Sequence, residues 1–259
     1  MKKKAILVVS FGSSYEETRR KTIDKIEKEI KNSFPYHSVY RAFTSPRIRK
    51  ILSRQQQSVW SVSEALQQMK QDKIEEVIVQ PTFIITGKEY EKMCQVIQRY
   101  KDAFEEVTIG HPLLGRMEDY FRVAEIFYES LGTIKEDEAV LCMGHGTEQL
   151  MSVSYAALDY VFKERVHPSI YMATIESYPG LEQVIRLLKK KTYTKVRIVP
   201  FMLVAGHHAY KDIKGSHEKS WENQLINAGY QVECVLRGLG ELPKIRQLFI
   251  EHIQNCMKK

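Results

Sequence analysis

Short apolar runs alternate with helix-like patterns along the whole chain. Apolar residues fill positions 5–9 and 139–143 almost without interruption, and similar runs recur downstream of each. A run that is apolar on successive positions is typical of a strand covered on both faces. Strands of this kind that alternate with helices predict βαβ units, right-handed crossovers and parallel sheets.

The segments between these runs have helical periodicity. Residues 15–31 place Ile23, Ile26 and Ile30 on one face, which predicts a helix that packs against a sheet. A second helix is expected after Pro179, a residue that suits a first helical turn. A third is expected over 220–228 before Gly229, and a last one after Pro243.

The two halves of the sequence resemble each other. Four segments of the first half resemble four segments of the second in the same order: 5–14 and 139–148, 38–44 and 169–175, 80–87 and 199–206, 107–115 and 232–240. Repetition in the same order indicates duplication. The spacing between the copies falls by about a dozen residues between the second and third matches. The first half therefore carries an insertion, and the polar stretch 55–58 is its expected place. We predict an N-terminal α/β half at 1–134 and a C-terminal half at 135–259, with the active site in the cleft between them.

Chemically active side chains follow the predicted strands of the second half. His145 lies between two glycines after the first strand, Glu176 follows the second, and His208 follows the third. The corresponding positions of the first half hold Phe11, Ser45 and Glu89, listed here in the same order. Ligands of parallel sheets bind beyond the carboxyl ends of the strands, so the three residues of the second half are expected to converge.

Two imidazoles and a carboxylate form a ligand set for a divalent ion such as Co²⁺, Fe²⁺, Ni²⁺ or Zn²⁺. Each residue alone has an ordinary interpretation. A lone histidine is more often a hydrogen-bonded polar residue, Glu176 suits a helix N-terminus, and His207 with His208 would make a surface pair. Their occurrence at three successive strand ends favours a functional site, with His145, Glu176 and His208 as metal ligands and both histidines as catalytic residues.

Composition narrows the class of protein. The chain has 259 residues, 43% of them hydrophobic, and a formal charge of +7. No apolar stretch approaches the roughly 20 residues of a membrane span. The four cysteines are scattered, which favours a reducing, cytoplasmic location. The basic residues are spread along the chain without interleaved aromatic residues, so we expect an acidic small ligand rather than nucleic acid. The phosphate-binding glycine motifs and the G-x-S-x-G elbow of hydrolases do not occur.

At these residues the sequence resembles the anaerobic-pathway cobalt chelatases of cobalamin biosynthesis, which act on sirohydrochlorin. The resemblance covers essentially the whole chain, and its motifs are Leu7–Gly12, Arg41–Ser45, Glu89–Lys92, Met143–Gly146, Glu176–Pro179, Met202–Gly206 and Gly238–Glu241. It implies a metal-inserting lyase made of two similar α/β halves. No organic cofactor is implied, and Co²⁺ is the substrate ion.

The resemblance also implies roles for individual residues. His145 and His208 match the active-site histidines of the family, Glu176 its metal-binding glutamate, and Glu89 an acidic position that faces the same cleft. The family pattern has one histidine here, preceded by an acidic residue that His207 replaces in this sequence. Whether His207 substitutes for His208 therefore stays open.

Near the strand ends of the first half, Ser10, Phe11 and Arg41 are candidates for contact with the substrate. Arginine suits bidentate pairing with the carboxylates of the tetrapyrrole. Insertion of Fe²⁺ or Ni²⁺, and a non-catalytic carrier of metal or tetrapyrrole, are the alternative functions. A homo-oligomer is also compatible with the sequence.

Overall fold

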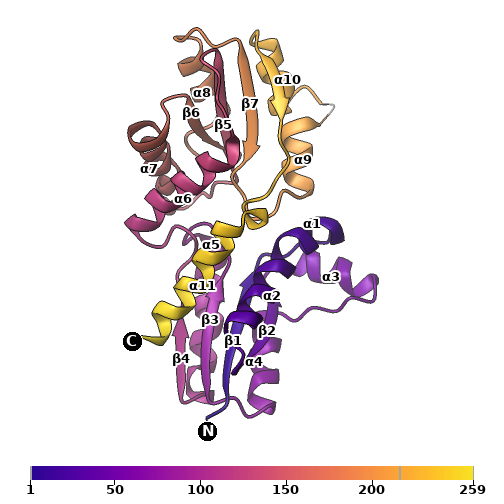
Figure 1. The fold of residues 1–259 in the computed structure, drawn as a ribbon. Helices are drawn as coiled ribbons and strands as arrows, with labels where there is room; N and C mark the ends of the chain where they lie inside the picture. Colours follow the sequence, from indigo (N-terminus) through magenta and orange to yellow (C-terminus); the bar gives the residue numbers. More distant parts are fainter. Residues whose placement is uncertain (1, 216, 259) are drawn as a thin grey trace. The chain divides into compact units, whose positions relative to one another are not determined.

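The computed structural model describes residues 2–215 and 217–258, without the side chains of residues 207–209. The chain forms two compact units (Figure 1). Unit 1 comprises residues 1–115 and 243–259, and unit 2 comprises residues 116–242. Each unit is described below by itself.

Unit 1 contains a four-stranded parallel sheet in the order β2-β1-β3-β4. Its strands are β1 (Lys4–Ser10), β2 (His37–Phe43), β3 (Glu76–Pro81) and β4 (Glu106–Ile109). Its helices are α1 (Glu16–Lys21), α2 (Ile23–Ser33), α3 (Pro46–Arg54), α4 (Val62–Gln71), α5 (Lys88–Tyr100), the 3-10 helix η1 (Lys101–Ala103) and α11 (Pro243–Met257).

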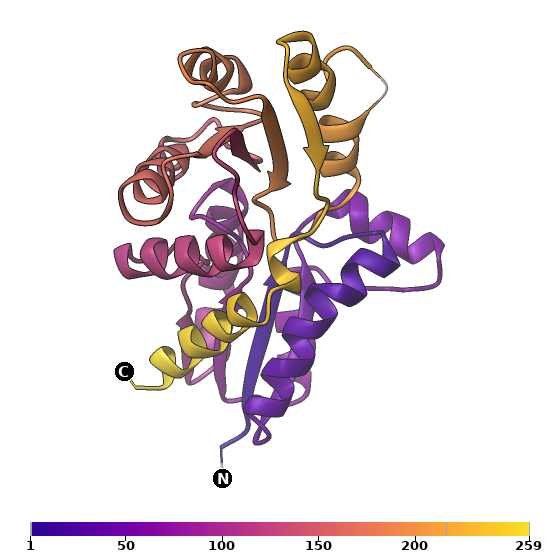
Figure 2. The same cartoon turned by 45° about the horizontal axis from the view of Figure 1, so that its top comes forward.

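Helices cover both faces of this sheet, which is why its central strand is apolar throughout. Residues 5–9 of β1 are fully buried. Side chains of α4 and α5, including Leu66 and Met93, join the cluster on one face. On the other face α11 contacts α2 and β3, and Figure 2 shows it crossing in front of the strands. The predicted pattern of strands buried on both faces is therefore confirmed.

Unit 2 repeats the arrangement, with strands in the order β6-β5-β7-β8. Its strands are β5 (Glu138–Gly144), β6 (Ile170–Thr174), β7 (Lys195–Pro200) and β8 (Gln231–Cys234). Its helices are α6 (Met117–Leu131), α7 (Val153–Val161), α8 (Leu181–Leu188), α9 (His207–Lys214), α10 (Trp221–Asn227), the 3-10 helices η2 (Leu150–Ser152) and η4 (Leu239–Glu241), and the π-helical turn η3 (Phe162–Val166).

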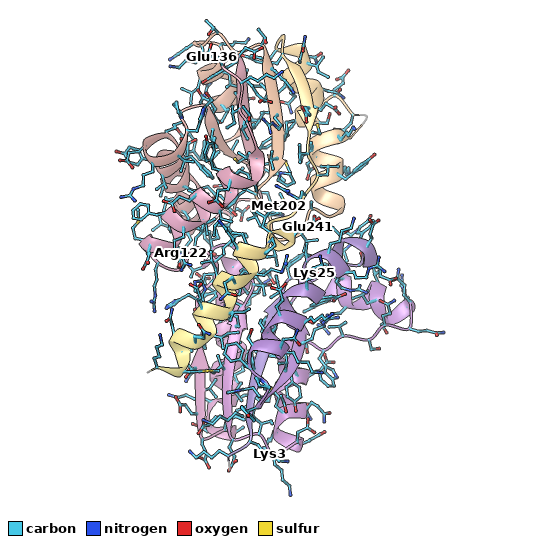
Figure 3. The ribbon with its side chains drawn as sticks, in the orientation of Figure 1. Lys3, Lys25, Arg122, Glu136, Met202 and Glu241 are labelled. Atoms are coloured by element: carbon cyan, nitrogen blue, oxygen red, sulfur yellow. The ribbon has the colours of Figure 1, made fainter. Side chains whose placement is uncertain are left out.

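The expected fold class, two similar halves that each hold a parallel sheet flanked by helices, is confirmed. Both sheets have the same order, with the first strand of each copy second in its sheet. In Figure 3, Met202 and Glu136 mark the two ends of the unit 2 sheet, because Met202 follows β7 and Glu136 precedes β5. The end near Met202 is the carboxyl edge, where ligands of parallel sheets bind.

The hydrogen bonds that close the second strand of each copy locate the insertion. Phe43 N donates to Trp60 O at 2.9 Å, and the equivalent Thr174 N donates to Pro179 O at 2.7 Å. The chain between the bonded residues is 12 residues longer in the first copy, 43 to 60 against 174 to 179. The extra residues contain α3, so the insertion begins earlier than the polar stretch at 55–58 and includes a helix.

The compact units differ from the expected division between residues 134 and 135. Helix α6 follows the first copy but packs in unit 2, where the ring of Phe127 lies 5.6 Å from that of Phe162 and 5.4 Å from that of Phe201. Helix α11 follows the second copy but packs in unit 1, where Arg246 Nε donates to Glu29 Oε1 at 2.7 Å. The last helix of each copy is therefore part of the other compact unit.

Within the described residues, no helix is long and apolar enough to cross a membrane.

Candidate functional site

The backbone brings His145 and Glu176 together at the carboxyl edge of unit 2. β5 ends at Gly144 and β6 at Thr174, in register with each other. Beyond the strands, Ile175 N donates to Gly144 O at 3.1 Å and Glu176 N donates to His145 O at 3.0 Å. Because the ladder continues past the strand ends, His145 and Glu176 are held side by side.

The side chains of the two residues also meet. His145 Nδ1 lies 3.5 Å from Glu176 Oε2, and 3.3 Å from the carbonyl oxygen of Gly146. The side chains are 48% and 56% exposed, so both remain accessible to a ligand from solvent. An exposed imidazole and carboxylate at this separation can hold a cation or share a proton. This pair is the part of the predicted constellation that the structure describes in full.

The two glycines that flank His145 are required by close packing. Gly146 has φ +83°, and a Cβ there would lie 3.0 Å from the Cβ atoms of Thr174 and Ser177. A Cβ on Gly144 would lie 2.6 Å from the ring of Tyr155. The Gly-His-Gly sequence therefore allows the loop of His145 to lie directly against the loop of Glu176.

The third predicted ligand lies outside the described side chains. Gly206 is the N-cap of α9, and His207 and His208 form its first turn. The side chains of both histidines are outside what the structure describes, so their convergence with His145 stays a prediction. β7, which precedes them, is hydrogen-bonded to β5. The backbone thus places the segment of His208 after the strand adjacent to that of His145.

Among the described side chains there is no group of three or more histidine, cysteine, aspartate or glutamate residues that could hold a metal ion. His207 and His208 are outside that search. The described part of the predicted site therefore consists of two side chains, His145 and Glu176.

At the carboxyl edge of its sheet, the first half has the same backbone hydrogen bonds as the second half but different side chains. Thr44 N donates to Ser10 O at 2.9 Å and Ser45 N donates to Phe11 O at 3.2 Å, as Ile175 and Glu176 do in the second half. Phe11 is the counterpart of His145 and is half exposed. Ser45, the counterpart of Glu176, is buried and its hydroxyl caps α3 by accepting from Ile48 N. The pairing of Phe11 with His145 and of Ser45 with Glu176, expected from the repeat, agrees with these bonds.

Glu89 lies in the first turn of α5, behind the N-cap Gly87. Glu91 N donates to Gly87 O at 3.1 Å, and Tyr210 N makes the same bond to Gly206 O at 3.0 Å in the second half. Glu89 is therefore the positional counterpart of His208. Its carboxylate accepts from Lys92 Nζ at 3.1 Å.

Two of the expected substrate contacts have other partners in the structure. Ser10 is 1% exposed, and its hydroxyl lies 2.8 Å from the hydroxyl of Thr82. Arg41 pairs with Asp24 and Glu27 of α2. Burial opposes the charge of Arg41, but the two carboxylates outweigh it and raise the pKa of its guanidinium. Ser10 is thus part of the core and Arg41 of a charge cluster with two carboxylates, and their expected contacts with a substrate stay predictions.

The sequence did not reveal the residues that pack against the two glycines beside His145. Tyr155 of α7 packs under Gly144, and burial raises the pKa of its phenol well above the ordinary value. Thr174 and Ser177 pack against Gly146. Only the Gly-His-Gly spacing signals this tight packing in the sequence, and it does not identify the partners.

Comparison with known proteins agrees with this fold. The family model described as "Cobalt chelatase (CbiK)" matches residues 4–258. The sirohydrochlorin cobaltochelatase of Salmonella typhimurium is 35% identical over 256 residues, which cover 98% of this chain and 97% of that protein. The sirohydrochlorin cobaltochelatase CbiKC of Nitratidesulfovibrio vulgaris is 32% identical over 98% of this chain and 90% of its own length.

Solved structures share the fold at lower identity. SirB from Bacillus subtilis with Fe³⁺ has a TM-score of 0.69 at 17% identity, and the match covers 98% of this chain and 95% of SirB. CbiX, described as the terminal enzyme of siroheme biosynthesis in denitrifying bacteria, has a TM-score of 0.59 at 17% identity, with 97% and 99% covered. The match to the family model over nearly the entire chain, with two relatives above 30% identity, shows that this chain belongs to the cobalt chelatase (CbiK) family.

Proposed function

We propose that this protein is a chelatase that inserts Co²⁺ into sirohydrochlorin. The observation that carries the proposal is the exposed pair of His145 and Glu176 at the carboxyl edge of unit 2, with Nδ1 and Oε2 separated by 3.5 Å. The two relatives named sirohydrochlorin cobaltochelatase support the choice of substrate and metal.

The separation of the pair suits two ligands of one ion. Divalent ions of this type bind imidazole nitrogen and carboxylate oxygen at roughly 2.0–2.2 Å. At a tetrahedral angle, two such ligands lie about 3.4 Å apart. The 3.5 Å between His145 Nδ1 and Glu176 Oε2 thus leaves room for one cation between them. With two protein ligands, the remaining coordination positions stay open to water and to the pyrrole nitrogens of the substrate.

Insertion of the metal releases two pyrrole protons while the ion exchanges its water ligands for four ring nitrogens. His145 and Glu176 hold the ion before transfer, and the carboxylate offsets part of its charge. Histidine is the side chain that most readily takes up a proton near neutral pH. We assign the uptake of one of the two protons to His208, which follows the adjacent strand, with His207 as the alternative, and the second proton passes to water.

The first half contributes substrate contacts in this proposal. Phe11, the half-exposed counterpart of His145, offers an aromatic surface for a tetrapyrrole. Glu89 is retained as a substrate contact because it is the counterpart of His208, and this role rests on the repeat alone.

The reaction needs no organic cofactor in this proposal, because the chemistry is ligand exchange and proton transfer. As metal insertion it falls in the lyase class. A reducing, cytoplasmic setting is supported by the four cysteines, which are scattered along the sequence without a paired spacing. The partners are sirohydrochlorin and a divalent ion, without nucleic acid, and a homo-oligomer stays a prediction.

The experiment that tests the function measures metal insertion with purified protein. Metal-free sirohydrochlorin is incubated anaerobically with Co²⁺, Fe²⁺ or Ni²⁺ in turn, and the absorbance change of the tetrapyrrole is followed. Turnover that is fastest with Co²⁺ is expected. Faster turnover with Fe²⁺ or Ni²⁺ would replace the proposed metal, and stoichiometric binding without turnover would indicate a carrier.

A further inference from the structure

Helix α3 is an addition to unit 1 without a counterpart among the described residues of unit 2. It belongs to the segment that is longer in the first copy, 43 to 60 against 174 to 179. The segment follows β2, an edge strand, and α3 projects from that side of unit 1 (Figure 1). An inserted element at the carboxyl edge of a sheet lies where ligand-binding loops usually occur.

The insertion and the start of α4 line an open cavity of about 300 Å³. Its lining includes Arg49 and Lys50 from α3, Ser53 and Ser58, and Trp60. Because Phe43 N bonds to Trp60 O at 2.9 Å, Trp60 is fixed beside the last residue of β2. The cavity therefore opens at the carboxyl edge of the unit 1 sheet.

The guanidinium of Arg49 has a donor without an acceptor among the described residues. Its Nη1 lies 3.3 Å from Glu64 Oε2, and its Nε is buried without a hydrogen-bond partner among the described residues. A buried donor without a partner costs free energy that an anionic ligand would recover by rearranging the side chain. Lys50, which is exposed beside it, adds a second positive charge to the lining.

Glu64 also lines the cavity, but its carboxylate is already occupied. Glu64 Oε2 accepts from Ser61 N at 2.6 Å, and Glu64 N donates to Ser61 Oγ at 3.2 Å, which together form the capping box of α4. These bonds to Ser61, with Arg49 nearby, lower the pKa of Glu64. The lining thus has two cations against one capped carboxylate, and this balance favours an anion.

Trp60 gives the cavity an aromatic wall. Its ring is stacked on that of Tyr40, with centroids 6.3 Å apart and planes at 29° to each other. Trp60 remains 43% exposed. Stacking on Tyr40 holds the indole in place, so it offers a fixed apolar surface beside Arg49 and Lys50. An acidic group carried on an apolar stem fits such a combination.

We propose that this cavity binds a carboxylate from the rim of the tetrapyrrole substrate, through Arg49 and Lys50. The inference rests on the proposed function, since it assigns substrate contacts for that reaction. A volume near 300 Å³ is the lower end of the range for whole organic ligands, so the cavity accommodates a side chain of the tetrapyrrole and leaves the macrocycle outside. Sirohydrochlorin carries carboxylates on short apolar stems around its ring, which matches the cations and the indole of the lining.

The test measures the binding of metal-free sirohydrochlorin by absorbance titration, at fixed ionic strength because screening alters charge pairs. Arg49→Ala is expected to raise the dissociation constant about tenfold, and Lys50→Ala about fivefold, from loss of charge-assisted contacts. Arg54→Ala is the matched control, since Arg54 is an exposed residue of the same helix outside the cavity lining. The dissociation constant of Arg54→Ala for sirohydrochlorin should stay within about twofold of that of the wild type.

The outcomes separate this inference from the proposed function. Affinities of Arg49→Ala and Lys50→Ala equal to that of Arg54→Ala would overturn the inference, as would a wild-type protein that does not bind sirohydrochlorin. Wild-type protein that binds the tetrapyrrole but inserts no Co²⁺ would overturn only the proposed function. Lys50→Ala keeps the test decisive if Arg49→Ala unfolds, because Lys50 is exposed.

A titration with inorganic phosphate distinguishes the substrate's carboxylate from a free anion. If the cavity serves a free anion, phosphate should change the fluorescence of Trp60 saturably in the wild type and not in Arg49→Ala. That result together with unchanged affinities for sirohydrochlorin would contradict the inference. Weakened sirohydrochlorin binding in both variants, without saturable phosphate binding, is the expected result.

Discussion

Glu176 lies opposite His145 at the ends of two neighbouring parallel strands, with Oε2 3.5 Å from Nδ1. The backbone fixes this relationship, because Glu176 N donates to His145 O at 3.0 Å in the position where Ser45 N bonds to Phe11 O in the other copy. The same bond is therefore present in both halves, and of the residues that it joins only His145 and Glu176 have side chains of the types that commonly bind metal ions. In the proposed function, one copy of the duplicated scaffold carries the side chains that hold the metal ion.

Glu176→Gln should weaken the use of Co²⁺ while the fold is kept. The amide retains the size of the side chain but loses its charge, so the half-saturating concentration of Co²⁺ should rise by about tenfold or more. Glu182→Gln is the control, because Glu182 is an exposed carboxylate of α8 close in sequence. An equal response of the two variants to Co²⁺ concentration would argue against a ligand role for Glu176.

The two adjacent histidines of α9 should differ in their effect. His208 is the counterpart of Glu89 behind equivalent N-cap glycines, so His208→Ala should lower kcat/KM by about 100-fold and His207→Ala by less than about threefold. Parallel turnover measurements on the two variants decide the assignment. A larger loss in His207→Ala would move the role to His207.

Gly146→Ala should destabilise the protein and reduce turnover. The residue has φ +83°, and the new Cβ would lie 3.0 Å from Thr174 and Ser177, so we expect a loss of about 2 kcal/mol in the free energy of unfolding. Gly229→Ala controls for the backbone angle alone, because Gly229 has φ +99° with open space around its Cβ position. Gly229→Ala should lower the free energy of unfolding by about 1 kcal/mol, without a loss of turnover. Equal costs in denaturant unfolding would mean that crowding at Gly146 is unimportant.

A buried ion pair in the unit 2 sheet should give a measurable pH dependence. Glu138 is 3% exposed at its side chain and accepts from Arg197 Nε at 3.0 Å and Nη2 at 2.6 Å. Burial alone would raise the pKa of Glu138, but Arg197 outweighs it and holds the pKa below the ordinary value of 4.5. A lowered carboxyl pKa stabilises the folded state above pH 4.5, and that stability is lost as the pH falls through the folded-state pKa.

Glu138→Gln should therefore cost about 3 kcal/mol at pH 7, with a smaller cost below about pH 4. Glu233→Gln is the matched control, because Glu233 pairs with Lys195 and its side chain is 50% exposed. This substitution should cost less than about 1 kcal/mol in the free energy of unfolding. Urea unfolding at several pH values measures both. A cost of Glu138→Gln that is independent of pH would show that the charge of this carboxylate is not what stabilises the sheet.

The sequence was sufficient to predict the fold class and which residues of the two copies are equivalent. Apolar runs and their order predict two parallel sheets, and the pairing of Phe11 with His145 agrees with the backbone bonds. The repeat does not show that α6 and α11 each pack in the unit formed mainly by the other copy. Their apolar faces indicate that they pack on a sheet, but periodicity carries no information about which sheet.

The candidate site was predictable only where a strand end alone determines position. His145 is the first residue after β5 and Glu176 the second after β6, so their proximity follows from the parallel register. Ser10 and Arg41 lie equally near strand ends, yet their side chains bond to Thr82 and to the acidic residues of α2. Such partners are distant in sequence, so a pattern of residue types cannot distinguish a bonded side chain from one available to a ligand.

The most direct test of the account is Co²⁺ insertion into sirohydrochlorin by His145→Ala, measured beside the wild type and His217→Ala. His217 is an exposed histidine of the same unit whose Nε2 lies 3.1 Å from Lys211 O, and its loss should leave turnover within about twofold. We predict that His145→Ala lowers kcat by about 100-fold or more, with the thermal unfolding midpoint unchanged. Turnover of His145→Ala at the wild-type rate would contradict the account.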